Sequence, residues 1–310
     1  MRADEVAVLL AVRNGMPHLP AQLGSIAGQT HAAWHLIAGD DGSEDGSADA
    51  LAAFAAAHPG RVRLVAGPQR GAAAHFLHLM ALAGPDVPHA AFSDQDDVWL
   101  PFKLDRAVAA LAAVPQGEPA LYCARTVICD AALNPVAEAP HWPRPLGFRN
   151  ALVQNACAGN TIVLNRAALT LAQAAAPAAL RAGIAVHDWW LYLLVSGAGG
   201  RVIRDATPVL FYRQHAGNHM GRNDTAAAAL ARIGRIAAGD WRDWIGRNLA
   251  ALMPEAGRLT AENRATLAAL AAARQAGPVA RLRAVRRLGL YRQTRAGQVA
   301  LCISALTGWI

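Results

Sequence analysis

Short apolar runs alternate with helical segments through the first third of the sequence, and this alternation limits the folds that the chain can adopt. Residues 6–12 are a continuous apolar run, typical of a strand buried on both faces of a parallel sheet. Further strands are expected at 34–38, 62–65 and 90–92, with helices at 17–29, 46–57, 72–82 and 102–113. Strands and helices that alternate in this way predict an α/β fold with helices on both faces of the sheet.

Polar side chains follow three of these strands at the point where each strand ends. Arg13 and Asn14 follow the first strand, Asp40 and Asp41 the second, and residues 94–97 the fourth. In α/β sheets, ligands bind beyond the carboxyl ends of the strands. Helix capping alone does not readily explain three polar clusters on one rim, so the sequence predicts a binding site at this edge.

The most acidic of these clusters lies in the stretch Phe-Ser-Asp-Gln-Asp-Asp-Val-Trp at residues 92–99, which places three carboxylates within four positions. Adjacent anions repel one another and resist burial. A divalent cation among them would neutralise that charge, and oxygen ligands suit Mg²⁺ or Mn²⁺, which keep coordination positions open for substrate phosphates. The alternative is a solvated acidic turn that caps the next helix.

Composition indicates a globular protein with a basic surface. The 310 residues are 54% hydrophobic and 16% charged, enough for one large domain or two smaller ones. The net charge of +7 comes from arginines, with Lys103 the only lysine, so either anionic ligands, a membrane surface or a codon bias explains it. The four cysteines lack metal-binding spacing, and no signal peptide or bilayer-length apolar run is visible. A cytoplasmic protein is expected.

The remainder of the chain is less regular. Residues 130–158 contain several prolines and are expected to form loops that line a site. Further strands are predicted at 161–164, 201–204 and 209–212, and further helices at 166–175 and 188–195. From residue 225 the sequence is helical, with Thr260 as a helix cap. Residues 279–310 combine arginines with apolar residues, which suits either a helix on an anionic membrane or a basic helix packed on the main domain.

Five motifs in this order resemble the family 2 glycosyltransferases with the GT-A fold, and the branch that builds bacterial surface polysaccharides, rhamnosyltransferases included, looks most similar. The motifs are residues 8–15, Asp40-Asp41-Gly42-Ser43, the Asp-Gln-Asp element within 93–99, His187-Asp188-Trp189-Trp190, and Tyr212-Arg213-Gln214-His215 with Asn218. The resemblance covers residues 5–222. It implies a mixed, mainly parallel GT-A sheet sandwiched between helices in residues 1–222, and a helical extension in residues 223–310.

The same resemblance implies roles for individual residues. Asp188 would be the general base, Asp96 would bind the metal with His215 as a further ligand, and Asp40 or Asp41 would contact the pyrimidine base. The residues implied in nucleotide and donor binding are Val12, Asn14, Asp40, Asp41, Asp94 (at the ribose), Gln95, Gly159, Asn160 and Arg213. Trp189 and Trp190 would form an acceptor platform.

Several of these roles have structural alternatives. His215 could be a surface histidine, Asp97 could cap the next helix, and Arg213 could pair with a nearby carboxylate. Trp189 and Trp190 are as well explained by a hydrophobic core. Two positions depart from the family pattern: Arg13 stands where an aromatic residue is common, and His75 where asparagine is frequent.

The expected activity is therefore metal-dependent, inverting transfer of a sugar from a UDP- or dTDP-linked donor to a saccharide or lipid-linked saccharide, with Mg²⁺ or Mn²⁺ as cofactor. Residues 279–310 would bring the enzyme to the inner face of the membrane, and no nucleic-acid partner is expected. A dinucleotide oxidoreductase is excluded because residues 12–17 lack G-x-G-x-x-G. The other alternative is a non-catalytic, membrane-peripheral protein that binds anionic glycan or lipid on a degenerate GT-A fold.

Overall fold

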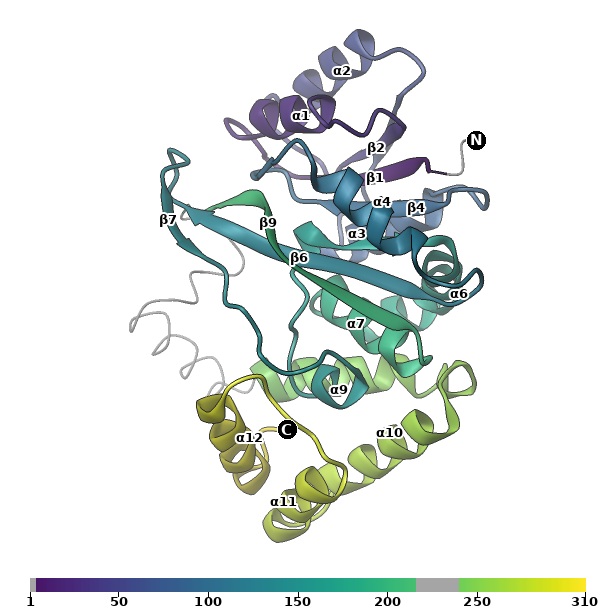
Figure 1. Cartoon of the computed structure of the whole chain (residues 1–310), viewed down its shortest axis with the longest axis vertical. Coiled ribbons are helices and arrows are strands. Elements are labelled where there is room, and N and C mark those ends of the chain that lie inside the picture. Colours follow the sequence, from purple (N-terminus) through teal and green to yellow (C-terminus); the bar gives the residue numbers. More distant parts are fainter. Residues whose placement is uncertain (1–3, 216–239) are drawn as a thin grey trace.

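The computed structural model describes residues 4–215 and 240–310, which form one large mixed sheet covered by helices (Figure 1). The strands are β1 (Val6–Val12), β2 (Trp34–Asp40), β3 (Val62–Ala66), β4 (His89–Ser93), β5 (Val98–Trp99), β6 (Ala120–Cys129), β7 (Pro135–Glu138), β8 (Val163–Asn165) and β9 (Arg201–Arg213). The helices before β9 are α1 (Leu19–Ala27), α2 (Ser47–Ala57), α3 (Ala72–Leu82), α4 (Lys103–Ala112), α5 (Phe148–Ala151), the 3₁₀ turn η1 (Gly159–Thr161), α6 (Arg166–Ala182) and α7 (His187–Gly197).

The strand order in the sheet is β3-β2-β1-β4-β8-β6-β9-β5, with β7 paired to β6. The first four strands of this order run parallel to one another, so their carboxyl ends lie at one edge. Beyond them the sheet is mixed: β8 is antiparallel to both β4 and β6, whereas β6 and β9 are parallel. The α/β fold predicted from the sequence is confirmed.

Strand β1 shows why the sheet needs helices on both faces. Val8 and Leu10 point into a core formed with α1, α2 and α4, whereas Ala7 and Leu9 point into the core on the opposite face with α3, α6 and α7. Successive side chains of a strand alternate between faces, so the continuous apolar run fills both cores. Each buried leucine contributes about 1.5–3 kcal/mol relative to an exposed one, and β1 is therefore a rigid support for the loop that follows it.

Two expected elements differ in the structure. Residues 201–204 and 209–212 belong to one strand, β9, because it pairs along its length with β6. Helix α6 continues past residue 175 to Ala182 with Pro177 inside it, since alanines along one face are buried in the core. Residues 130–158 are largely loop, as predicted, but they also include the short strand β7 and the helix α5.

The C-terminal helices are α9 (Asp240–Leu252), the 3₁₀ turn η2 (Ala256–Arg258), α10 (Ala261–Arg274), α11 (Pro278–Arg287) and α12 (Arg295–Thr307), drawn in green to yellow in Figure 1. Thr260 caps α10 as predicted, its side chain accepting a hydrogen bond from the Asn263 amide. Leu267, Leu301 and Ile310 are buried in the same core as α6 and α7. These helices are thus packed on the core that α6 and α7 form, and none of the described helices is long and apolar enough to cross a bilayer. The predicted boundary at residues 222 and 223 lies outside the described residues.

Candidate active site

The loops after β1, β2 and β4 meet at the carboxyl edge of the sheet. Gln95 joins two of them: its side-chain oxygen accepts from the Arg13 amide at 2.7 Å, and its side-chain nitrogen donates to the Arg13 carbonyl at 3.1 Å. Asn14, in the left-handed region at φ 50°, accepts from the Glu44 amide at 2.9 Å and so ties the β1 loop to the β2 loop. Val12 is buried beneath them. The side-chain amides of Asn14 and Gln95 were predicted to contact the donor. In the structure they hold the loops together.

The two aspartates after β2 have different environments. Asp41 is buried, and its Oδ1 accepts a hydrogen bond of 2.5 Å from the Gln69 amide, so this carboxylate fixes the loop after β3. Asp40 accepts from the Ser43 amide through Oδ2, while its buried Oδ1 has no hydrogen-bond partner among the described residues. An unsatisfied buried acceptor is costly unless a ligand supplies the donor. Of the two aspartates, Asp40 is therefore the better placed to bind a ligand.

His75 packs beneath this position. Its ring lies so close to Gly39 that a Cβ there would be 2.2 Å from the His75 Nε2. This contact explains the glycine near the end of strand β2. Burial lowers the pKa of His75, so the ring is neutral near pH 7. The Nε2 atom has no partner among the described residues. The departure from the family's asparagine thus places a neutral imidazole against Gly39, within the influence of the Asp41 and Asp40 carboxylates.

Three carboxylates gather in the loop after β4. Burial, together with the charges of Asp96 and Asp188, raises the pKa of Asp94 to about 7. Burial, together with the charges of Asp94 and Asp96, raises the pKa of Asp97 well above its usual value, although a 2.6 Å hydrogen bond from the Asn160 amide opposes the shift. Asp97 is fully buried. This burial excludes the solvated-cap alternative for Asp97, and the mutual repulsion shows that the carboxylates lie close to one another.

Asp96 points toward the end of β9. Its Oδ2 lies 2.8 Å from the His215 Nε2, so the structure brings together the two residues predicted to bind metal. His18 lies beside them, with its ring centroid 4.8 Å from that of His215. Arg213 donates to the Asp96 carbonyl at 3.0 Å and to the Ala131 carbonyl at 2.5 Å, so its guanidinium fixes the backbone of the acidic loop.

The donor set fits a hard divalent cation shared with a ligand. No cluster of three or more His, Cys, Asp or Glu side chains suited to a metal occurs among residues 4–215 and 240–310. Asp96 and His215 would supply two protein ligands, and substrate phosphates would have to complete the coordination of Mg²⁺ or Mn²⁺. A cation there would also relieve the repulsion that raises the pKa of Asp94 and Asp97. The side chains of Asp96 and His215 therefore fit a divalent cation.

Asp188 occupies the first turn of α7. Its Oδ2 accepts from the Gly159 amide at 3.0 Å and its Oδ1 from the Trp189 amide at 2.6 Å. Desolvation raises the pKa of Asp188 to about 6, whereas hydrogen bonds from Asn155, Trp189 and Gly159 oppose the rise. A carboxylate with this pKa is ionised at neutral pH yet basic enough to accept a proton.

The turn η1 connects Asp188 to the acidic loop. A Cβ on Gly159 would lie 3.1 Å from the His187 ring and 3.3 Å from the Asp188 Cβ, so only glycine fits without displacement. Asn160, the next residue, donates to Asp97. His187 is stacked on Phe76 with ring centroids 4.0 Å apart, and burial lowers the pKa of His187 to about 3. His187 is thus a neutral packing residue that orients the start of α7.

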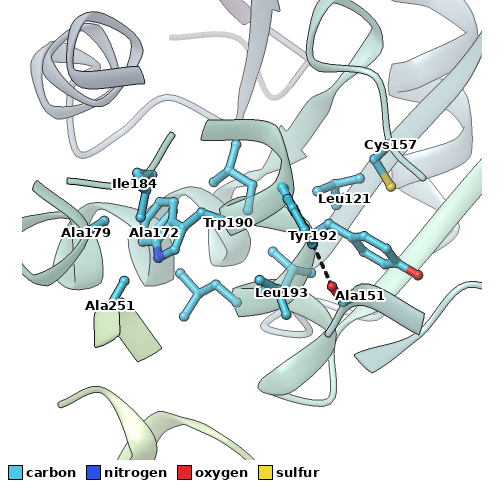
Figure 2. Close-up of a cluster of buried hydrophobic side chains, with 14 of the residues drawn as sticks. Leu121, Ala151, Cys157, Ala172, Ala179, Ile184, Trp190, Tyr192, Leu193 and Ala251 are labelled. Atoms are coloured by element: carbon cyan, nitrogen blue, oxygen red, sulfur yellow. Dashed lines mark hydrogen bonds between the residues drawn. The ribbon is translucent and has the colours of Figure 1, made fainter. Parts of the chain in front are cut away.

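The two tryptophans predicted as an acceptor platform are core residues instead. Trp189 is 1% exposed and Trp190 is fully buried. The Trp189 indole donates to the Ala151 carbonyl at 2.6 Å, and Trp190 lies among Ala172, Ala179 and Ile184 in Figure 2. Neither indole can contact an acceptor in this structure, because α7 is apolar on all sides and is surrounded by protein.

Three further residues at the site were not predicted. His18 precedes α1 and contacts His215. Asn155 hydrogen-bonds to Asp188 from the loop before η1. Lys103, at the start of α4, has its amine fully buried beside the acidic loop, where it donates to the Asn160 carbonyl at 2.6 Å. The one signal in the sequence was for Lys103, which is a single lysine in a chain whose other basic residues are arginines.

Known proteins resemble this chain in sequence and in fold. Residues 7–160 match the profile described as glycosyl transferase family 2. The uncharacterized glycosyltransferase alr2836 of Nostoc sp. is 31% identical over 104 residues, which are 34% of this chain and 32% of that protein. The dTDP-rhamnosyl transferase RfbG of Shigella flexneri is 25% identical over 239 residues, 73% of this chain and 78% of that protein.

Among solved structures, the crystal structure of S. aureus TarS 1–349 in complex with UDP-GlcNAc superposes with a TM-score of 0.55 at 11% identity, covering 98% of this chain and 91% of that chain. The fold, with carboxylates at the ends of its parallel strands, is that of the GT-A glycosyltransferases. The family profile and the sequence relatives then identify the chain: it belongs to glycosyl transferase family 2.

Proposed function

We propose that this protein transfers a sugar from a nucleoside-diphosphate donor to a saccharide or lipid-linked saccharide acceptor, with inversion at the anomeric carbon. The observation that carries the proposal is the position of Asp188 near the loop of residues 94–96. Asp188 has a pKa of about 6, and its charge helps to raise the pKa of Asp94. One side of the site can hold a diphosphate and the other can accept a proton.

On the donor side, Asp40 would accept a hydrogen bond from the ring N–H of a pyrimidine base, because its buried Oδ1 lacks a partner among the described residues. Asp94 would face the ribose. UDP- and dTDP-linked donors both carry such an N–H. The names of two related proteins, a dTDP-rhamnosyl transferase and a TarS complex with UDP-GlcNAc, are consistent with this choice.

Asp96 and His215 would hold Mg²⁺ or Mn²⁺ at the diphosphate. When bound, the cation would neutralise the charge that develops on the leaving diphosphate. Asp94 is itself more readily ionised once that positive charge is present, since its pKa is raised partly by the neighbouring carboxylates.

On the acceptor side, Asp188 would take the proton from the attacking hydroxyl. The Gly159 and Trp189 amides hold its two oxygens in place, so the carboxylate is oriented before the acceptor arrives. Attack from the face opposite the diphosphate needs a single base and no covalent intermediate, and inversion follows from that geometry.

A thermal-shift panel tests the donor assignment directly. UDP- and dTDP-sugars together with Mn²⁺ are expected to raise the melting temperature, because a ligand that binds only the native state stabilises it by about 2.7 kcal/mol at a hundredfold excess over Kd. Asp40→Asn should lose most of this shift for pyrimidine nucleotides. A shift of equal size with GDP- or ADP-sugars would contradict pyrimidine recognition.

The non-catalytic alternative is a glycan- or lipid-binding protein on the same fold. It predicts binding without turnover. Incubation of the protein with its best-binding donor and Mn²⁺ should release nucleoside diphosphate over several turnovers in the presence of an acceptor extract. Release that never exceeds background with any donor that binds would favour the binding protein.

We further propose that the enzyme works at the cytoplasmic face of a membrane as a peripheral protein. Residues 275–310 contain six arginines and no Asp or Glu, so most of the formal net charge of +7 lies in this segment. On α12, Val299, Ile303 and Leu306 are 60%, 51% and 42% exposed at a spacing that puts them on one helical face. Basic and apolar side chains together suit an anionic bilayer surface.

A charge variant tests the membrane proposal. Replacing Arg283, Arg286 and Arg287, all exposed on α11, with Gln should weaken binding to vesicles that contain phosphatidylglycerol by roughly 3 kcal/mol, about a hundredfold. Co-sedimentation measures the change, and Val136→Gln, which replaces an exposed apolar residue far from α11, is the control. Deletion of residues 279–310 is a poorer test, because it removes Leu301 and Ile310 from the core. Equal sedimentation of the triple variant and the wild type would refute the proposal.

A further inference from the structure

Lys103 has a buried amine in the middle of the candidate active-site scaffold. It is the only lysine in the sequence, and its side chain is fully buried at the start of α4. Lysine is almost never fully buried unless it is paired, because its ammonium group loses its water. A buried lysine amine is therefore expected to make specific interactions that offset the cost of its desolvation.

The contacts of Lys103 point to the acidic loop and to η1. Its Nζ donates to the Asn160 carbonyl at 2.6 Å and lies 3.1 Å from the centroid of the Trp99 ring. Burial lowers the pKa of the Lys103 amine well below its usual value, whereas the charges of Asp97 and Asp94 oppose that shift. The amine therefore lies within the field of the carboxylates, held by one hydrogen bond and one aromatic face.

The turn η1 carries a contact to each half of the site. The Gly159 amide donates to Asp188 at 3.0 Å, and the Asn160 side chain donates to Asp97 at 2.6 Å. Lys103 holds the carbonyl of Asn160, between these two contacts. Movement of this carbonyl would change both hydrogen bonds at once, because they originate from consecutive residues.

We propose that Lys103 is a positioning residue that fixes η1 and thereby sets the spacing between the acidic loop and Asp188. The inference rests on the proposed sugar transfer, in which the acidic loop holds the donor diphosphate and Asp188 receives the acceptor proton. Lys103 touches neither substrate. Its effect is on the geometry in which the two carboxylate groups meet the reacting atoms.

Lys103→Met keeps most of the volume and removes the donor and the charge. The expected result is a fall in kcat of about 10- to 100-fold, the range that a small misplacement of reacting groups produces. Binding of nucleoside diphosphate with Mn²⁺ should persist, because Lys103 touches neither ligand and contacts the Asn160 carbonyl and the Trp99 ring instead. A weaker Gly159 hydrogen bond would raise the pKa of Asp188, so the acidic limb of the kcat profile should move to higher pH.

Two companion variants separate positioning from general damage. Arg106→Met is the matched control. Arg106 is a long cationic side chain on the same helix, and it pairs with Asp205 away from the site. The Arg106→Met variant should leave kcat and its pH profile unchanged. Lys103→Arg retains donors and charge and should recover part of the lost rate. If Lys103→Met keeps the wild-type kcat and acidic limb, or if the Met and Arg variants behave alike, the positioning role is refuted.

Chemical labelling tests the burial without any assay of activity. Because Lys103 is the single lysine, an amine-reactive ester can label only this side chain and the terminal amine, and peptide mass spectrometry distinguishes the two. Labelling of Lys103 should be slow in the native protein and fast in guanidinium chloride. Fast labelling of the native protein would overturn the inference even if transfer is demonstrated. Slow labelling in a protein without transferase activity would instead place the failure with the proposed function.

Discussion

Asp188→Asn is expected to abolish most of the transfer while the donor still binds. Removing a positioned general base lowers kcat by about 10²- to 10⁴-fold. Asn keeps one of the two carboxylate oxygens, so it can still accept from either the Gly159 or the Trp189 amide, and burial of α7 should hold the start of the helix in place. Steady-state kinetics with the best donor, together with calorimetric binding of nucleoside diphosphate and Mn²⁺, give the two quantities to compare. Near-normal kcat in the variant would remove Asp188 as the base.

The pH dependence gives an independent check on Asp188. Its pKa of about 6 means that the carboxylate is ionised above pH 6 and protonated below it. The wild-type kcat should therefore fall about tenfold per pH unit on the acidic side, with the limb centred near pH 6. The residual rate of Asp188→Asn should lack this limb. A limb that persists unchanged in the variant would assign the titration to another group.

The same pKa shift predicts that the variant is the more stable protein at neutral pH. Desolvation raises the folded-state pKa of Asp188 above its ordinary value of 3.8, so folding favours the protonated form. This stabilising contribution is complete below pH 3.8 and is lost as the pH rises through 6, by at most about 3 kcal/mol. Asp188→Asn carries no charge at any pH. Its melting temperature should exceed that of the wild type at pH 8, and the difference should shrink toward pH 4.

The meeting of the polar loops at one edge of the sheet could be predicted from the sequence, because that edge follows from local pattern. Residues 6–12 could be recognised as a strand buried on both faces, and parallel strands put their carboxyl ends together. Asp40 and Asp94 could be named from short motifs at those ends, and Asp188 from a short motif at the start of a helix. None of these steps required knowledge of how distant segments pack.

What the sequence could not provide are the contacts that depend on packing between distant segments. The pair formed by Asp96 and His215 spans 119 positions, and the bonds from Gln95 to Arg13 span 82. Polar residues that fix loops and polar residues that bind ligands look alike in a sequence. Gln95, Asn14 and Arg213 were therefore predicted to touch the donor, and the structure shows them holding backbone groups.

Burial of aromatic and charged side chains was hidden for a similar reason. The tryptophans at 189 and 190 lie on a helix that is apolar all round, and periodicity cannot tell an enclosed helix from one with an exposed aromatic face. Lys103 stands near the start of an amphipathic helix where an exposed lysine would be ordinary. Its burial and its hydrogen bond to Asn160 became visible in the structure and place the amine beside the candidate site.

Asp96→Asn is expected to weaken binding of the metal and of the donor together. The substitution removes the carboxylate that lies 2.8 Å from the His215 imidazole and leaves the remaining acidic residues in place. Loss of one charged partner in a partly buried site costs about 2–5 kcal/mol, which corresponds to roughly 30- to 4,000-fold in affinity. Titration calorimetry with Mn²⁺ and nucleoside diphosphate measures both ligands, and Asp86→Asn, which alters an exposed surface carboxylate, is the control.

The two active-site substitutions should therefore separate the two halves of the reaction. Asp188→Asn lowers kcat at constant donor affinity, whereas Asp96→Asn raises the apparent Kd of the donor and the Mn²⁺ concentration needed for half-maximal rate. His215→Gln should act in the same direction as Asp96→Asn with a smaller effect, because it removes the imidazole nitrogen and leaves the Asp96 carboxylate in place. Removing Asp96 also removes a repulsion that raises the pKa of Asp94, so Asp94 should titrate at lower pH in that variant. An unaltered Mn²⁺ dependence in Asp96→Asn would refute the assignment of Asp96 as a metal ligand and would leave the proposed role of Asp188 unaffected.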